Sequence, residues 1–183
     1  TTNAVQPRYA GDDPSLGHGG VYGGDCYLAR LSPDGSQIVA ATYFGGSKQE
    51  RNVYGMELDR AGNIVITSMT RSSDVPTTRG CFQAKHGGGR GSIFVAKLSP
   101  ELSQVIWCTY LGGSGDEAPR GGLTLDARDH VCIFGTTASN DFPTTPAAFQ
   151  EKRRGARDAF VAKLKADGSG LIWSTLFGGN GDD

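Results

Sequence analysis

Short apolar runs, separated by turns rich in glycine and polar residues, recur along the chain with a nearly constant spacing. The run Ile-Phe-Val-Ala-Lys-Leu at residues 93–98 returns as Ala-Phe-Val-Ala-Lys-Leu at residues 159–164. The related run Cys-Tyr-Leu-Ala-Arg-Leu lies at residues 26–31, so successive copies are 67 and then 66 residues apart. A Thr-Xaa-Xaa-Gly-Gly segment begins 16 residues after the start of each run. A period of this length, matched in apolar runs and in turns, predicts a repeat architecture.

Each period contains four short segments in which most positions are β-branched, aromatic or otherwise apolar. In the last copy they are residues 122–126, 130–134, 159–164 and 171–177, and the copy before it begins with residues 55–59, 63–67 and 93–98. The third segment is apolar on both faces, as a strand is when its sheet lies between two neighbours. No apolar pattern with a 3.6-residue period runs for a dozen residues, which argues against long helices. The pattern predicts an all-β chain of β-propeller blades, each with four antiparallel strands.

The connection between the third and fourth predicted strands carries a hairpin signal. An Asp-Gly pair stands there at residues 34–35 and again at residues 167–168. Glycine adopts a positive φ without strain, so Asp-Gly between two apolar runs favours a tight turn. The middle copy has Glu101 and Leu102 at this place, which predicts a turn of another type.

Four segments carry a resemblance to a known repeat: residues 141–145, 158–164, 173–175 and 178–183. They are similar to the units of the SBBP repeat family of bacteria, and the resemblance extends over the chain apart from a divergent stretch at residues 9–22. The family resemblance implies a β-propeller, commonly seven-bladed, in a secreted or surface protein. It implies no catalytic or ligand-binding residues.

Counting strands divides the chain into about two and a half blades, a partial propeller. The predicted units are residues 1–46 (a half blade with strands three and four, including the divergent loop at 9–22), 47–113 and 114–179 (complete blades), and 180–183 (the start of the next crossing loop). A closed propeller needs about four blades or more. We therefore expect other chains, or the remainder of a larger propeller, to cover the two ends.

Composition bears on both the fold and the classes of partner. The 28 glycines among 183 residues favour many turns over long helices. Formal charge is balanced, with 18 basic and 19 acidic side chains, so no electrostatic case exists for binding nucleic acid or a membrane surface. No run reaches the length of a transmembrane helix, and no signal peptide opens the sequence.

The four cysteines occupy four different positions of the repeat, whereas a disulfide framework would recur with the repeat. They are Cys26, Cys81, Cys108 and Cys132. We interpret them as small, mostly buried apolar residues and expect no two of them to be bonded to each other. Cysteine usage leaves the redox compartment open.

Two kinds of charged loop are candidates for ligand binding. Both lie at the end of the predicted strands where the long connections are expected, and long loops on a rigid scaffold commonly carry function. The acidic crossing loops, which connect the fourth strand of one unit to the first strand of the next, hold Asp116, Glu117, Asp182 and Asp183. Carboxylate oxygens are suitable ligands for Ca²⁺, so calcium is the one candidate cofactor. In the alternative interpretation, Asp116 and Asp182 cap turns through local hydrogen bonds.

The second candidate is a basic loop. Its cations are Lys152, Arg153, Arg154 and Arg157. Arginine side chains bind phosphate and carboxylate groups with paired hydrogen bonds, so this loop could hold an anionic glycan, a phosphate or an acidic partner. The alternative is a solvated loop without a ligand.

Conventional catalytic patterns are weak. The three histidines, His18, His86 and His130, lie at unrelated repeat positions, and His130 takes the place of Asn63 at a turn. Trp107 and Trp173 recur in the fourth strand, and we interpret them as packing residues between blades.

These observations favour a non-enzymatic scaffold or protein-binding module in a secreted or surface bacterial β-propeller protein. The expected location is extracellular, at the cell surface or periplasmic. The alternative is a propeller-based glycan hydrolase or lyase with its site on the long-loop rim near the axis. Fold alone does not decide between the two.

Overall fold

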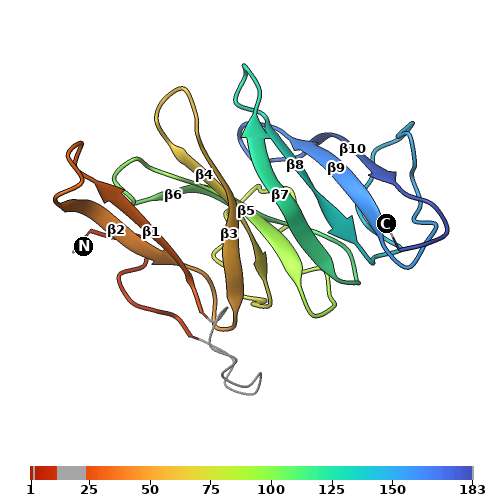
Figure 1. The fold of residues 1–183 in the computed structure, drawn as a ribbon, viewed down its shortest axis with the longest axis horizontal. Helices are drawn as coiled ribbons and strands as arrows, with labels where there is room; N and C mark the ends of the chain where they lie inside the picture. Colours follow the sequence, from red (N-terminus) through yellow and green to blue (C-terminus); the bar gives the residue numbers. More distant parts are fainter. Residues whose placement is uncertain (2, 12–23, 183) are drawn as a thin grey trace.

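The computed structural model describes residues 1, 3–11 and 24–182. Within these residues the chain forms ten β-strands and no helix. Strands β1 (Cys26–Leu31) and β2 (Ile38–Phe44) pair antiparallel in a two-stranded sheet, here called the N-terminal sheet (Figure 1). Most of the predicted divergent loop at residues 9–22 lies outside the described residues.

Two four-stranded antiparallel sheets follow, each with its strands in chain order. The middle sheet consists of β3 (Glu50–Leu58), β4 (Ile64–Thr70), β5 (Ser92–Leu98) and β6 (Val105–Leu111). The C-terminal sheet consists of β7 (Glu117–Leu125), β8 (Val131–Thr137), β9 (Asp158–Leu164) and β10 (Leu171–Phe177). The prediction of an all-β chain with four antiparallel strands per complete unit is confirmed.

The first strand of each four-stranded sheet is longer than predicted. β3 and β7 begin at Glu50 and Glu117, five residues before the apolar pattern begins. The assignment of Glu117 to a crossing loop is therefore wrong. Glu50 pairs with Thr70 and Glu117 with Thr137, and the register then shifts within each strand. Those shifts interrupt the alternation of inward and outward side chains on which the sequence pattern depends.

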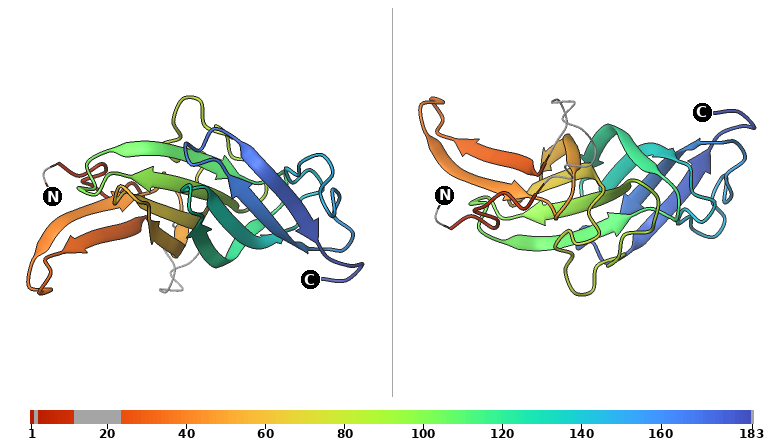
Figure 2. Two further views of the ribbon diagram at one scale, coloured as in Figure 1. Left: turned by 90° about the horizontal axis from the view of Figure 1, so that it is seen from above. Right: turned by 90° about the horizontal axis from the view of Figure 1, so that it is seen from below.

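The three sheets pack face to face in chain order, so the N-terminal and C-terminal sheets lie at opposite ends of the molecule (Figures 1 and 2). One core lies between the N-terminal and middle sheets, where the rings of Phe44 and Phe94 are 5.6 Å apart. The other lies between the middle and C-terminal sheets and contains Val95 of β5 and Phe160 of β9. Burial of these apolar faces holds the sheets together.

Strand β5 is buried on both faces, whereas its counterparts at the ends of the stack are not. All seven residues of β5 are buried. In β9, buried and half-buried residues alternate, and β1 has four exposed residues among its six. Tyr27 and Leu31 of β1 are exposed, although the equivalent Phe94 and Leu98 of β5 are fully buried. Each end of the stack therefore exposes a face that is covered inside it.

The turn between β5 and β6 has the same hydrogen bonds as its two counterparts, so the prediction of another turn type is wrong. The Leu102 N–H donates to the Ser99 carbonyl at 2.9 Å, as the glycines of the other two turns do to their partners. The φ angle of Leu102 is 55°, close to 72° at Gly35 and 69° at Gly168. Full burial of the leucine side chain in the core against the N-terminal sheet offsets the strain of this angle.

The long connection after each second strand runs beside the outer strand of its own sheet. The Gln83 carbonyl accepts a hydrogen bond from Tyr110 N in β6, and the Gln150 carbonyl accepts one from Leu176 N in β10, both at 2.9 Å. Gln6 makes the same bond to β2 at 3.1 Å. These contacts cover part of an edge that would otherwise expose unpaired backbone groups.

Tight turns and long connections lie at opposite ends of the strands, here called the turn rim and the long-loop rim (Figure 1). All four cysteines are free, and Cys26 and Cys108 are buried. Across the described residues, no helix has the length and apolar character needed to cross a membrane.

Candidate functional site

A buried glutamate stands at the start of each first strand on the long-loop rim. The exposed fraction of Glu50 is 1%. Its Oε1 accepts hydrogen bonds from Thr70 Oγ1 and Ser72 Oγ, each at 2.6 Å, and its Oε2 accepts one from Gly46 N at 3.1 Å. The carboxylate therefore ties the preceding crossing loop to the end of β4.

Glu117 makes the same set of bonds one period later. Its Oε1 accepts from Thr137 Oγ1 at 2.7 Å and from Ser139 Oγ, and its Oε2 accepts from Gly113 N at 3.2 Å. The threonine and serine lie 20 and 22 residues after the glutamate in both copies. The repeated Glu, Thr and Ser positions are the signal in the sequence that could have revealed this network, and it was missed.

A second carboxylate fixes each crossing loop from the connection that follows. Asp74 Oδ1 accepts a hydrogen bond from Ser47 N at 2.9 Å, and Asp141 Oδ1 accepts from Ser114 N and Oγ at 2.8 Å. These bonds lower the pKa of both aspartates. The crossing loops are thus held by fixed, ionised groups that belong to the next sheet.

The two glutamates share a raised pKa. Burial raises the pKa of Glu50 and of Glu117 to about 7 in each case, although the hydroxyl and amide donors oppose the shift. Asp25 Oδ1 converges with Glu50 on Gly45, and Ser92 Oγ converges with Glu117 on Gly112. Both atoms are buried and without a hydrogen-bond partner.

A proton on each glutamate would give these two unpaired atoms a hydrogen-bond partner. A protonated Glu50 can donate to the Asp25 carboxylate, which agrees with the hydrogen bond from Glu50 that opposes the burial-raised pKa of Asp25. A protonated Glu117 can likewise donate to the Ser92 hydroxyl. Because two close carboxylates cannot easily both ionise, the pair of Asp25 and Glu50 favours one shared proton.

The predicted calcium ligands that the structure describes make contacts within the protein. Glu117 is buried and its oxygens accept three hydrogen bonds. Asp116 Oδ1 accepts from Arg90 N at 2.6 Å, and Asp182 forms an isolated parallel bridge with Arg157. Asp183 lies outside the described residues. Among the residues that are described, no group of three or more histidine, cysteine, aspartate or glutamate side chains converges as a metal site would.

The basic loop is folded around a buried aspartate rather than around an open anion site. Asp158 accepts hydrogen bonds from Arg154 N at 3.0 Å and from Gly155 N at 3.1 Å. Arg153 Nη2 donates to Asn140 Oδ1 at 2.7 Å. The side chains of Lys152 and Arg154 are exposed, and Arg157 is half-buried. The loop therefore offers two solvent-facing cations beside the C-terminal sheet.

At the turn rim of each four-stranded sheet, an ion pair joins the residue that follows the first strand to a lysine of the third strand. Lys97 Nζ lies 3.0 Å from Asp59 Oδ2, with side chains 7% and 4% exposed. Lys163 Nζ lies 2.6 Å from Asp126 Oδ2, with side chains 20% and 28% exposed. The hydrogen bond from Lys163 lowers the pKa of Asp126. The pair in the middle sheet is thus buried, and the equivalent pair in the C-terminal sheet is partly exposed to solvent.

His130 has the turn role that its repeat position predicted. Its N–H donates to Asp126 Oδ1 at 2.9 Å, and its Nδ1 lies 3.0 Å from Asp126 Oδ2. Asn63 makes the equivalent bonds to Asp59 at 2.8 and 2.9 Å. Histidine and asparagine therefore serve the same turn in the two copies.

Comparison with protein-family models and with curated protein sequences gives no match to this chain. The functional interpretation therefore depends on the geometry of the chain itself.

Proposed function

We propose that the sheets are blades of a β-propeller of the SBBP repeat type. In this proposal the chain is a non-enzymatic scaffold or protein-binding module of a secreted or surface bacterial protein. The remainder of the ring, in the same or another chain, covers the two ends of the stack.

The observation that carries the proposal is the burial of β5 on both faces between two sheets of the same kind. The two faces of β5 pack on different neighbours. Ile93 and Val95 belong to the core shared with the C-terminal sheet, and Phe94 and Leu98 belong to the core shared with the N-terminal sheet. Stacking in one constant sense is what a ring of blades requires.

The inner strands also support a ring. Strands β3 and β7 are in contact, and a Cβ on Gly55 would lie 2.7 Å from the Cα of Gly122 (Figure 1). The absence of a side chain at these positions lets the first strands of neighbouring sheets approach closely. Close first strands with outer strands further apart produce wedge-shaped neighbours, which suits packing around an axis.

The charged loops support a scaffold better than an enzyme. In the carboxyl pair of Asp25 and Glu50, Asp25 is half-buried, and Glu50 is buried and accepts three internal hydrogen bonds. A glycosidase needs its two carboxyl groups open to a sugar. The exposed Lys152 and Arg154 instead suit an acidic surface of a protein partner.

The test is electron microscopy of the intact native particle that contains this chain, with its mass measured in parallel. We expect an annular particle of radial four-stranded sheets. An open, linear array of sheets would contradict the proposed ring. Cleavage of a defined panel of glycans by the same particle, abolished by changes in its carboxylates, would favour the enzymatic alternative.

A further inference from the structure

The first internal boundary is held by two hydrogen bonds to one turn of the following sheet. Arg30 Nη1 of the N-terminal sheet donates to the Pro100 carbonyl at 3.1 Å. Val5 N donates to the Leu102 carbonyl at 2.9 Å. Pro100 and Leu102 belong to the turn between β5 and β6 of the middle sheet.

The second boundary repeats both bonds with equivalent residues. Lys97 Nζ donates to the Ala166 carbonyl at 3.2 Å, and Phe82 N donates to the Gly168 carbonyl at 2.8 Å. Trp107 adds a third bond from Nε1 to the Ala166 carbonyl at 2.9 Å. A socket of one cation and one backbone N–H therefore receives two carbonyls of the next turn in both cases.

Side-chain size is matched across each boundary. At the first boundary, the small Ala40 and the large Leu102 are members of the same buried core. At the second, the large Trp107 faces Gly168, where an added Cβ would lie 2.6 Å from the indole ring. A turn with glycine therefore fits a socket with tryptophan, and a turn with leucine fits a socket with alanine.

A third socket stands open at the C-terminal end. Trp173 is 40% exposed, whereas Trp107 is 4% exposed, and Phe149, in the place of Phe82, is 79% exposed. Lys163 occupies the position of Lys97. The socket therefore has its cation, its backbone N–H and its tryptophan, and no turn among the described residues of the same chain packs on it.

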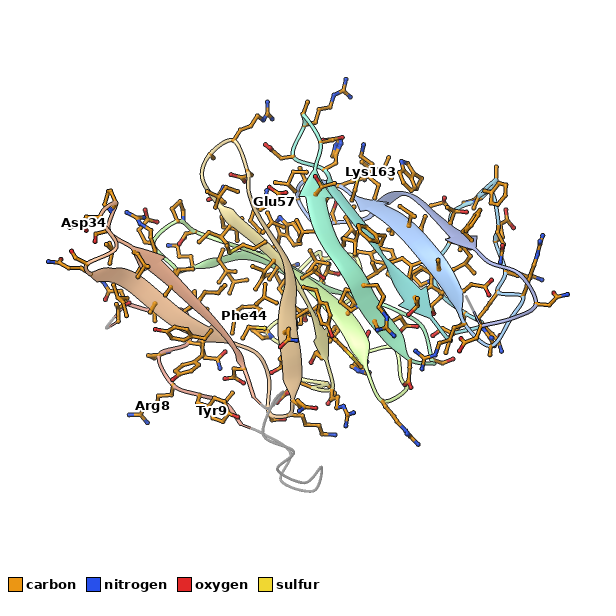
Figure 3. The ribbon with its side chains drawn as sticks, in the orientation of Figure 1. Arg8, Tyr9, Asp34, Phe44, Glu57 and Lys163 are labelled. Carbon is orange, nitrogen blue, oxygen red and sulfur yellow. The ribbon has the colours of Figure 1, made fainter. Side chains whose placement is uncertain are left out.

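The matching turn stands open at the other end of the molecule. Residues 32–37 form the turn between β1 and β2 with the same hydrogen bonds as residues 165–170. Pro33 and Gly35 are exposed, and an added Cβ on Gly35 would have nothing within 4 Å. This is a turn with glycine, the kind that a tryptophan socket accepts. Figure 3 labels Asp34 in this turn of the N-terminal sheet and Lys163 in the C-terminal sheet.

We propose that two copies of this chain associate head to tail, with the C-terminal socket of one copy on the residue 32–37 turn of the other. Lys163 Nζ donates to the Pro33 carbonyl of the second copy, Phe149 N donates to its Gly35 carbonyl, and the Trp173 ring packs on Gly35. The inference rests on the proposed function, in which the stack continues beyond both ends.

The apolar faces around the socket and turn agree with this pairing. Phe177 is 64% exposed, although Leu111 at the same repeat position is fully buried under the following sheet. Phe134 of β8 is also exposed, whereas the equivalent Thr67 is buried. The second copy would cover these rings with Tyr27 and Leu31, the exposed apolar residues of its β1. Two different faces meet, so the contact is heterologous and can extend to rings or filaments.

The experiment is sedimentation of the 183-residue chain over concentrations up to the millimolar range, with two variants that each block one end. Phe177→Glu places a charge at the socket end, and Leu31→Glu places one at the turn end. Each side chain is already exposed, so both variants should retain the circular dichroism spectrum of the unmodified chain. The matched control is Ile172→Glu, because Ile172, Ile106 and Val39 are exposed at all three repeat positions.

We expect the unmodified chain and the control to form oligomers that grow with concentration, and each blocked variant to remain monomeric alone. An equimolar mixture of the two blocked variants should form a dimer, because one intact socket meets one intact turn. Lys163→Met should weaken this association by about tenfold through loss of a charged donor. A folded chain that stays monomeric at millimolar concentration would overturn the inference.

Symmetric association would also overturn it. If only one of the two variants loses association, or if their mixture does not form a dimer, the two ends do not meet each other. If the native particle is annular but the 183-residue chain stays monomeric, head-to-tail association is contradicted and the proposed ring is not. If the native particle is an open array but the two blocked variants form a dimer when mixed, only the proposed ring is contradicted.

Discussion

The indole Nε1 of Trp107 donates a 2.9 Å hydrogen bond to the carbonyl of Ala166 across the boundary between two sheets. Lys97 shares this acceptor, so one carbonyl of a tight turn receives two donors from the neighbouring sheet. The ring of Trp107 then packs on Gly168, two residues further along the turn. This arrangement makes the turn a structural connector between sheets, in addition to its role as the link between β9 and β10.

Gly168→Ala should destabilise the chain more than Gly35→Ala. The two glycines have nearly the same φ, 69° and 72°, so both alanines carry a strain of about 1 kcal/mol. Only at residue 168 does the new Cβ also meet the Trp107 ring, which adds about 1–3 kcal/mol of overpacking. Urea denaturation of both variants at one low concentration measures the difference. Equal losses of unfolding free energy would show that the ring moves aside without cost.

Lys97→Met should be strongly destabilising, and Lys163→Met should have a clearly smaller effect. Removal of the Lys97 ammonium leaves Asp59 buried without its partner at 3.0 Å, a change that costs about 3 kcal/mol or more. Lys163 forms the equivalent pair with Asp126 where water reaches both groups. Thermal unfolding of both variants at neutral pH is the measurement. Similar losses would mean that burial inside the stack does not strengthen the dependence on the pair.

Stability should fall as the pH rises from about 5 to 8 because of Glu50 and Glu117. Burial raises the folded-state pKa of each from the ordinary 4.5 to about 7. Their stabilising contribution is therefore fully present below the unfolded pKa and is lost as the pH passes through the folded pKa. A shift of this size corresponds to about 3 kcal/mol for each carboxyl.

The double variant Glu50→Gln with Glu117→Gln provides the comparison for this pH dependence. Burial lowers the pKa of His86, which reduces stability as the pH falls below its ordinary value of 6.5, but this contribution is common to both proteins. The difference in unfolding free energy between the two proteins should therefore change steadily across this pH window. A constant difference would show that the glutamates ionise as they do in the unfolded chain.

Thiol reagents should distinguish two classes of cysteine. Cys26 and Cys108 are buried, and burial raises the pKa of the Cys26 thiol to about 12 and also raises that of Cys108. Because the thiolate is the reactive form, both should react slowly in the native chain. Cys81 and Cys132 are partly exposed and should react first. Under denaturing, non-reducing conditions four thiols are expected, and a smaller number would indicate a disulfide.

Sequence reasoning found the candidate loops more reliably than their chemistry. The positions of the acidic and basic loops followed from repeat alignment, and so did the turn role of His130. The burial of Glu117 did not, because the glycine-rich, acidic segment that precedes it has the composition of an exposed loop. Its partners are Thr137, the last residue of β8, and Ser139, which follows that strand, and only the fold places them within hydrogen-bonding distance of Glu117.

The period of the sequence by itself determined the number and order of the strands, the antiparallel hairpins at residues 34–35 and 167–168, and the apolar character of both faces of β5. These features depend on local backbone preference and on side-chain alternation, which the residues of one segment express alone. Only the tertiary structure decided which faces are covered. Trp107 and Trp173 are the same residue at the same repeat position, yet one is buried and the other half-exposed. The positive φ of Leu102 has the same origin, because a neighbouring sheet supplies the burial that stabilises a conformation its own sequence disfavours.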